Sequence, residues 1–171
     1  MSREREEKPM KLRLLLTKVC NRRCRGCCNK DWNLDALPVC TNYSAFNEFL
    51  LTGGEPLLYP QLVKKVVADI RRQSSFPIYM YTAMSSNRNL FFDILNVLDG
   101  ITLTLHGRKD LEPFKRINEG IRSWLGKKLR LNVFKGIPLT GLDLSCWKVK
   151  PNMYWVKNAP LPDDEVFMRL M

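Results

Sequence analysis

Three cysteines near the start of the chain form the clearest chemical pattern in this sequence. Cys20, Cys24 and Cys27 have the spacing C-x3-C-x2-C and follow the apolar residues 12–16. Thiolates are the preferred protein ligands of iron–sulfur clusters, and a cluster of four irons takes four ligands. Three cysteines therefore leave one iron with an open coordination position, the feature that separates a catalytic metal site from a closed structural one.

A glycine-rich segment follows a second short apolar run. It reads Gly53, Gly54, Glu55 and Pro56, and it comes directly after residues 48–52. Glycine lets a ligand approach backbone N–H and C=O groups with no side chain in the way. Ligands of parallel α/β folds gather at the carboxyl ends of the strands. Because both motifs follow strand-like runs, we expect them to face each other across one site.

The elements that must position these residues alternate along the chain. We predict strands over residues 11–17, 48–52, 76–82, 101–106 and 129–133, with a sixth over 153–156. Strands that alternate with helices indicate a parallel sheet. A complete eight-unit barrel takes roughly 250 residues, so 171 residues hold only five or six units. The predicted fold class is α/β, a partial (βα)5-6 open barrel with outer helices.

The intervening helices show apolar stripes and terminal signals. Pro60 suits a first helical turn, and an apolar stripe follows it at Leu62, Val63, Val66, Val67 and Ile70. We expect Gly100 to stop the next helix and Asp110 to cap the N-terminus of the third.

Composition limits the class of protein. Hydrophobic residues make up 45% of the chain, which is typical of globular proteins rather than disordered ones. We predict a charged tail at residues 1–10 and a single domain over 11–171. The sequence has no apolar run of membrane-spanning length and no signal peptide pattern, so we expect a cytoplasmic protein. The net charge of +11 favours acidic partners such as nucleic acid, nucleotides or acidic proteins.

At the two motifs the sequence resembles the radical S-adenosylmethionine (SAM) superfamily. The resemblance implies that Cys20, Cys24 and Cys27 hold a 4Fe-4S cluster and that residues 53–56 contact SAM, which chelates the open iron. It implies reductive cleavage of SAM to a 5′-deoxyadenosyl radical, which takes a hydrogen atom from a substrate. It also implies an electron donor such as a flavodoxin or ferredoxin. Further SAM contacts are expected near the strand ends, at Thr104, His106 and Asn132, with Thr82 and Ser85 close by.

The cysteine loop, CNRRCRGCCNKDW, resembles the activating enzyme of anaerobic ribonucleotide reductase, which installs a glycyl radical on a large partner. Two features depart from that family: Cys28 stands where an aromatic residue is usual, and no Gly-Pro-Gly stretch precedes the cysteines. The alternative within radical SAM chemistry is an enzyme that modifies a small molecule, nucleotide or peptide.

A different class of function is a zinc-binding nucleic-acid module. Cys24 and Cys27 have the spacing of a zinc knuckle, which Cys40 or Cys146 would complete. This alternative leaves residues 53–56 unexplained. Otherwise Cys40 and Cys146 are expected as small buried residues, and Cys28 as a thiol packed under the loop.

Several other residues carry expectations. The cations of the cysteine loop either ease cluster reduction and dock an acidic electron carrier, or form a solvated surface. His106, the single histidine, is either structural or part of the site. Trp147 and Trp155 are expected to close a core. The cations are Lys18, Arg22, Arg23, Arg25 and Lys30.

Overall fold

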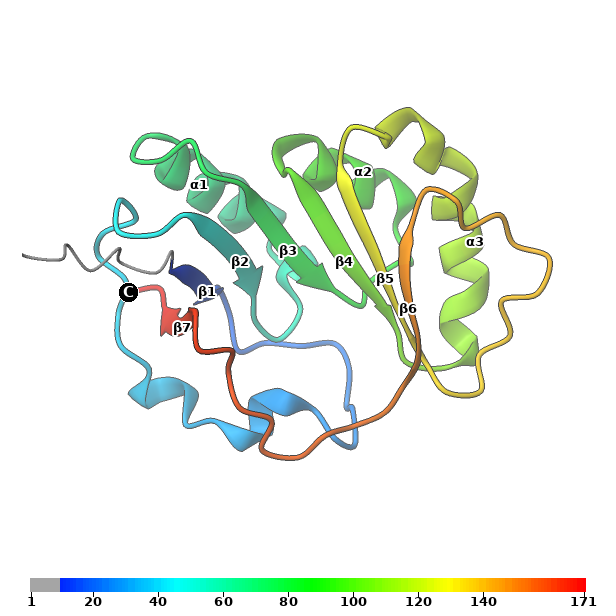
Figure 1. The fold of residues 1–171 in the computed structure, drawn as a ribbon, viewed down its shortest axis with the longest axis horizontal. Coiled ribbons are helices and arrows are strands. Elements are labelled where there is room, and N and C mark those ends of the chain that lie inside the picture. The colour runs from blue at the N-terminus through cyan, green and yellow to red at the C-terminus, as the bar shows by residue number, and fades with distance from the viewer. Residues whose placement is uncertain (1–9) are drawn as a thin grey trace, which may run out of the picture.

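Seven strands form one all-parallel sheet in the computed structural model, which describes residues 10–171 (Figure 1). The order of the strands is β6-β5-β4-β3-β2-β1-β7. Apart from Met10, the predicted charged tail lies outside the described residues. The strands are β1 Lys11–Leu15, β2 Glu48–Thr52, β3 Ile78–Thr82, β4 Gly100–Leu105, β5 Lys128–Phe134, β6 Lys148–Met153 and β7 Glu165–Arg169.

The first five strands confirm the predicted α/β alternation, and the sheet is that of a partial, open α/β fold. The sixth strand was predicted too late, at residues 153–156, whereas β6 ends at Met153. Its Pro151 is tolerated because β6 is an edge strand, where one unpaired backbone position costs little. The seventh strand, β7, was not predicted. It pairs with β1 at the opposite edge of the sheet.

Three α-helices pack against one face of the sheet (Figure 1). They are α1 Pro60–Arg71, α2 Arg88–Val97 and α3 Leu111–Gly120. Pro60 occupies the first turn of α1 as predicted, and the apolar stripe of that helix is buried, with Leu62 at its margin. The matching strand residues, such as Leu12 and Leu103, are fully buried. Alternation along the strands therefore sends one set of apolar side chains toward the helices, while the other face carries polar residues together with apolar ones such as Leu15 and Phe167.

Gly100 and Asp110, which were predicted to end one helix and to cap another, have other roles. Gly100 begins β4 instead of ending α2, and a Cβ atom there would lie 2.2 Å from the carbonyl oxygen of Lys128. Glycine thus lets β4 and β5 approach each other. Asp110 precedes α3 but makes no side-chain cap to it. Its carboxylate instead accepts hydrogen bonds from the backbone N–H groups of His106 and Gly107.

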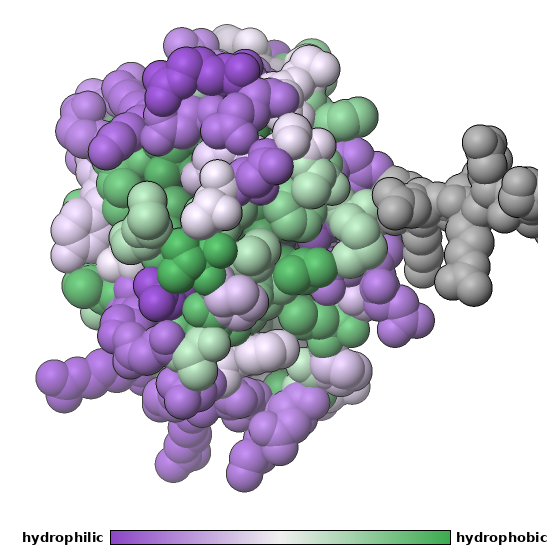
Figure 2. Space-filling model, turned by 90° about the vertical axis from the view of Figure 1, so that its left-hand side faces the viewer, coloured by the Kyte–Doolittle hydropathy of each residue, from purple (hydrophilic) through white to green (hydrophobic). Residues whose placement is uncertain are grey.

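The end of the sheet near β7 carries a small second cluster on the face away from the helices. Leu15, Leu37 and Phe167 form it, and Leu34 and Leu161 pack beside them. Figure 2 views the molecule from the β7 end, at right angles to the view of Figure 1, and shows hydrophobic residues in the middle of that side with hydrophilic side chains around them. This cluster anchors the segment after the cysteines to the C-terminal strand.

A closing segment, residues 154–164, links β6 at one edge of the sheet to β7 at the other (Figure 1). It touches the cysteine loop on its way. The backbone N–H of Asn158 donates to Asp31 at 2.8 Å, and the Trp155 side chain packs so closely on Gly26 that any Cβ atom there would overlap it. No α-helix within residues 10–171 has the length and apolar character to cross a membrane.

Candidate functional site

The loops that follow β1 and β2 are joined by backbone hydrogen bonds. The N–H of Gly54 donates to the carbonyl of Thr17 at 2.7 Å, and the N–H of Glu55 donates to that of Val19 at 2.9 Å. A Cβ atom on Gly53 or Gly54 would lie 2.5 Å or 2.1 Å from those same carbonyl oxygens. The two glycines therefore let the loops pack together. That they also let a ligand approach the backbone stays a prediction.

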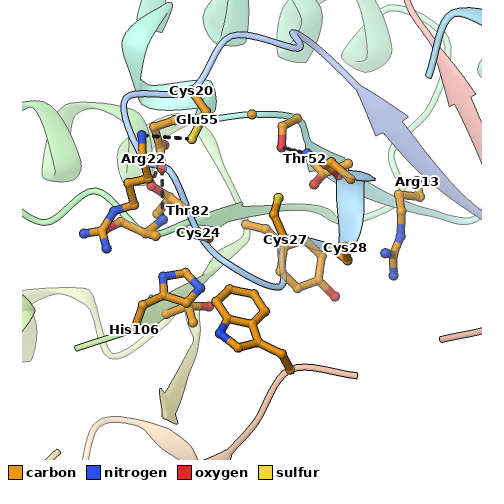
Figure 3. A pocket seen from close by; sticks show the side chains of 17 residues that line it. Arg13, Cys20, Arg22, Cys24, Cys27, Cys28, Thr52, Glu55, Thr82 and His106 are labelled. Carbon is orange, nitrogen blue, oxygen red and sulfur yellow. Dashed lines mark hydrogen bonds between the residues drawn. The ribbon is translucent and has the colours of Figure 1, made fainter. Parts of the chain in front are cut away.

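This packing brings both motifs to one pocket at the carboxyl ends of the strands, with a volume of about 230 Å³. The side chains of Cys20 and Cys27 point into the same space (Figure 3). We call this space the cysteine pocket. The residues that were predicted for the site and that line this pocket are Cys20, Cys24, Cys27, Gly53, Gly54, Glu55, Thr104 and His106.

The donor set fits an iron–sulfur cluster with one open position. All three cysteines are free thiols, and each is at least partly exposed to solvent. Burial raises the pKa of the Cys24 thiol, and the neighbouring Cys27 and Cys20 add to the rise, while Arg22 opposes it. The backbone N–H of Arg22 donates to the sulfur of Cys20 at 3.4 Å, the type of contact that tunes the potential of a cluster.

Within residues 10–171, no group of three or more His, Cys, Asp or Glu side chains is arranged to hold a single metal ion. A four-iron cluster binds each thiolate to a different iron, so its ligands stand further apart than those of one ion. Cys40 is buried in the main core and Cys146 lies beside α3, both away from the pocket. Cys28 is exposed and lines the pocket, which corrects the expectation that it packs under the loop.

Glu55 ties the glycine segment to the end of β3. Its carboxylate is 1% exposed and accepts three hydrogen bonds: from the Thr82 hydroxyl at 2.7 Å, from the Leu57 N–H at 3.0 Å and from the Ala83 N–H at 3.0 Å. On the other side of the segment, the Asn29 amide donates to the Gly53 carbonyl at 2.7 Å. The segment is therefore held from both neighbouring loops.

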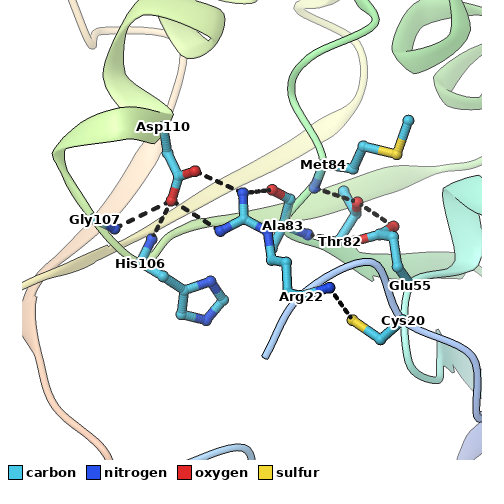
Figure 4. Close-up of polar contacts among 9 residues, drawn as sticks. All are labelled: Cys20, Arg22, Glu55, Thr82, Ala83, Met84, His106, Gly107 and Asp110. Carbon is cyan, nitrogen blue, oxygen red and sulfur yellow. Dashed lines mark hydrogen bonds and ion pairs between the residues drawn. The ribbon is translucent and has the colours of Figure 1, made fainter. Parts of the chain in front are cut away.

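Arg22, on the loop after β1, and Asp110, on the loop after β4, form a buried ion pair at the carboxyl ends of the strands (Figure 4). The guanidinium donates to the carboxylate at 2.6 and 3.1 Å, and also to the Ala83 carbonyl at 2.8 Å. Asp110 accepts further hydrogen bonds from the N–H groups of His106 and Gly107. Burial alone would raise the pKa of Asp110, but the hydrogen bonds from Arg22 and the backbone outweigh it, so the pKa is lowered.

His106 lies on the pocket wall in contact with aromatic rings. Its ring stacks on Trp155 with centroids 5.0 Å apart and lies 4.9 Å from Phe134. Burial lowers its pKa to about 4, and the nearby Arg22 acts in the same direction. Its Nδ1 atom is buried with no hydrogen-bond partner among residues 10–171. The lowered pKa favours the neutral imidazole at neutral pH.

The structure separates the remaining predicted contacts. Thr104 lines the pocket, and Thr82 does so while its hydroxyl is engaged by Glu55. Ser85 is buried beside a different hollow. Asn132 lines a neighbouring hollow on β5 and β6, because it lies one strand further across the sheet from Thr104. Of the three residues predicted to contact SAM from the later strands, Thr104 and His106 therefore line the same pocket as the cysteines, and Asn132 does not.

The two tryptophans differ. Trp147 is buried in the main core, where its indole N–H donates to the Asn118 side chain at 2.8 Å, as expected of a core residue. Trp155 is 38% exposed and lines the cysteine pocket. It belongs to the site and not to a closed core.

Three residues of the site have roles that the sequence did not predict. Arg13 lines the pocket from β1 and pairs with Glu165 on β7, a contact hidden because β7 itself was not predicted. Asp110 was predicted as a helix cap, and its partner Arg22 was predicted either to ease cluster reduction and dock an electron carrier or to lie on a solvated loop. An Asp five residues after a strand gives no signal that an arginine of a distant loop will reach it.

The five cations of the cysteine loop fall into two groups, those that contact a carboxylate or carbonyl oxygen and those that are only exposed. Arg22 is half-buried against Asp110, the Lys18 ammonium pairs with Asp35 at 2.6 Å, and the Lys30 ammonium donates to the Cys24 carbonyl at 3.0 Å. Arg23 and Arg25 are exposed.

Comparison with known proteins adds no further constraint. No protein-family model matches this chain, and a search of curated proteins found no match.

Proposed function

We propose that this protein is a radical SAM enzyme. The observation that supports this most directly is that the cysteine triplet and the Gly-Gly-Glu-Pro segment, separate in sequence, line a single pocket at the carboxyl ends of parallel strands. A cluster with an open iron requires three thiolate ligands, and the cysteine loop supplies three thiols. Polar backbone groups line another side of the pocket.

The residues divide the work by their positions. Cys20, Cys24 and Cys27 would bind a 4Fe-4S cluster, and residues 53–55 would contact the amino acid part of SAM. When bound, the two cofactors together supply a 5′-deoxyadenosyl radical for hydrogen abstraction. The protein holds the glycine segment rigid through Glu55, holds the cysteine loop through the Arg22–Asp110 pair, and shields the pocket with the His106–Trp155 stack.

The decisive experiment is anaerobic reconstitution followed by an assay for 5′-deoxyadenosine with SAM and dithionite. We expect a brown protein with about four irons and an equal amount of sulfide, together with 5′-deoxyadenosine formation that requires reductant. Cys24→Ala should abolish both. A colourless protein that binds one zinc would instead support the nucleic-acid module.

Cys28→Ala is the matched control, because Cys28 adjoins a proposed ligand and lines the same pocket. The proposal predicts that this variant keeps its iron and its activity, since a fourth thiolate ligand would fill the open iron position. Loss of iron in Cys28→Ala equal to that in Cys24→Ala would contradict the proposed ligand set.

Electron delivery should involve the exposed arginines of the cysteine loop. Arg23 and Arg25 are exposed beside the pocket mouth, whereas Arg22 is tied to Asp110. Charge reversal at Arg23 and Arg25 should slow reduction by a flavodoxin or ferredoxin more than reduction by dithionite. Equal slowing of both reactions would argue against docking at these residues.

The substrate expected from the resemblance is the glycine of a large glycyl radical enzyme, with a small molecule, nucleotide or peptide as the alternative. Candidate substrates prepared in deuterated form distinguish the two classes, because deuterium would appear in 5′-deoxyadenosine only with the true substrate. A group of cations beside the cysteine pocket favours the small-molecule class.

A further inference from the structure

The face of the sheet away from the helices carries two rows of laterally paired polar residues. In parallel strands, paired residues point to the same face of the sheet. One row runs Tyr81, Thr102, Arg130 and Lys148 across β3 to β6. The other runs Thr104, Asn132 and Lys150 across β4 to β6.

These rows line a hollow of about 380 Å³ next to the cysteine pocket. Tyr81 lines both spaces, and Thr102 and Thr104 lie on the same face of β4, one in each space. We call the second space the basic hollow. It is formed by Tyr81, Thr102, Arg130, Asn132, Lys148, Val149 and Lys150.

The positive charges of the basic hollow are not balanced by the protein. Among residues 10–171, no carboxylate forms an ion pair with Arg130, Lys148 or Lys150. The carboxylates that act on Tyr81 are Glu48 on β2 and Glu165 on β7, which lie on the same face of the sheet but beyond β3 from the strands that carry the three cations. Glu165 pairs with Arg13, whereas Glu48 acts on Lys11, whose ion pair is with Asp164.

We propose that the basic hollow binds the phosphate group of a small-molecule substrate whose reacting part lies in the cysteine pocket. A guanidinium and two ammonium groups, with hydroxyl and amide donors between them, match the several oxygens of a doubly charged phosphate better than a single carboxylate. A space of this volume is within the range of small-molecule sites, and its walls are rigid strands.

The geometry also sets the size of the substrate. Neighbouring strands are about 4.8 Å apart, so Arg130 on β5 lies roughly 10 Å across the sheet from Tyr81 on β3. A molecule that reaches from the cysteine pocket to the three cations is therefore about as long as a nucleotide. The anion site stands on its own, but its link to a reaction rests on the proposed function.

Pyrophosphate is a suitable probe because it carries the charge without the rest of a substrate. Calorimetric titration at constant ionic strength should show saturable binding at one site. Arg130→Gln and Lys150→Gln should each weaken it about tenfold, since each removes a charge-assisted hydrogen bond. Arg130→Lys should bind with intermediate affinity, because the charge remains while the planar fork is lost.

Lys65→Gln is the matched control, an exposed cation on α1 on the far side of the sheet. Pyrophosphate affinity should not change in this variant. Equal weakening in Lys65→Gln would mean that the protein attracts anions only through its net charge, which would overturn the proposal. Absence of saturable binding would overturn it as well.

Two competing ligands complete the test. Citrate that binds as tightly as pyrophosphate would reject the preference for phosphate. Single-stranded RNA that binds through the same cations, when pyrophosphate does not, would assign the surface to nucleic acid and reject the small-molecule site.

The titration is run on iron-loaded protein and on protein without iron. If the cluster never forms but pyrophosphate binds as described, the anion site stands and the radical SAM proposal fails. If 5′-deoxyadenosine forms but pyrophosphate does not bind, the reverse holds.

Discussion

Cations around the cysteine pocket and cations around the basic hollow are used differently. Beside the pocket, Arg22 is buried against Asp110, and Arg13 is paired with Glu165. In the hollow, Arg130 and Lys150 face open space with no acidic partner among residues 10–171. Charges of the first kind fix the shape of a site, whereas charges of the second kind are available to a ligand.

The contrast has an energetic meaning. A buried charge whose partner is removed keeps its desolvation penalty, so each member of the Arg22–Asp110 pair depends strongly on the other. An exposed unpaired cation contributes little to stability and repels its neighbours. Substitutions in the two regions should therefore separate effects on folding from effects on binding.

The largest effect is expected from Asp110→Ala. This change leaves the Arg22 guanidinium buried without its carboxylate and also removes the acceptor for the His106 and Gly107 N–H groups. The free energy of unfolding should fall by about 3–5 kcal/mol in urea denaturation. Asp93→Ala, which breaks the exposed pair with Lys64, should cost no more than about 1 kcal/mol. Similar losses in both variants would show that the first pair is not structural.

A smaller loss is expected from Glu55→Gln. The amide nitrogen of glutamine cannot accept the hydrogen bonds that the carboxylate receives, so one buried donor of Thr82 or Ala83 is left facing another donor. Thermal denaturation should show a loss of about 2–3 kcal/mol. Thr82→Val, which removes only the hydroxyl, should cost about 1 kcal/mol. An unchanged free energy of unfolding in Glu55→Gln would contradict a stabilising role for the hydrogen bonds to the Glu55 carboxylate.

Acid should weaken the fold through His106. Its pKa is lowered to about 4 from a normal value of 6.5, so between these pH values the unfolded chain binds a proton that the folded chain does not. Stability is therefore lost as pH falls from 6.5 toward 4. Allowing for partial exposure, the loss between pH 7.5 and 5 should be about 1–2 kcal/mol.

His106→Phe tests the source of this acid sensitivity, because phenylalanine keeps the ring stack on Trp155 but cannot take a proton. Urea denaturation at the two pH values should show that the variant loses this part of the pH dependence. A pH dependence equal to that of the original protein would place its origin in another group.

The smallest effect on folding is expected in the basic hollow. Lys148→Gln and Lys150→Gln should change the free energy of unfolding by no more than about 0.5 kcal/mol, while they weaken pyrophosphate binding. A large loss of stability in either variant would mean that these cations have structural partners and would remove the contrast between the two regions.

The sequence was sufficient for the elements that follow local patterns. The strand at 48–52, the first-turn Pro60 and the buried stripe of α1 follow from alternation and helical periodicity, which depend on neighbouring residues only. The meeting of the two motif loops also followed from the sequence, because the carboxyl ends of parallel strands share one edge of a sheet.

The tertiary structure decided how that edge is assembled. Asp110 reaches Arg22, Arg13 pairs with a strand that no local pattern announced, and Trp155 returns from the closing segment to cover His106. It also decided that Asn132 faces the basic hollow and not the cysteines. Each of these contacts joins residues far apart in the chain. The curvature of the sheet and the connection between its two edges bring these residues together, and no short stretch of sequence encodes either feature.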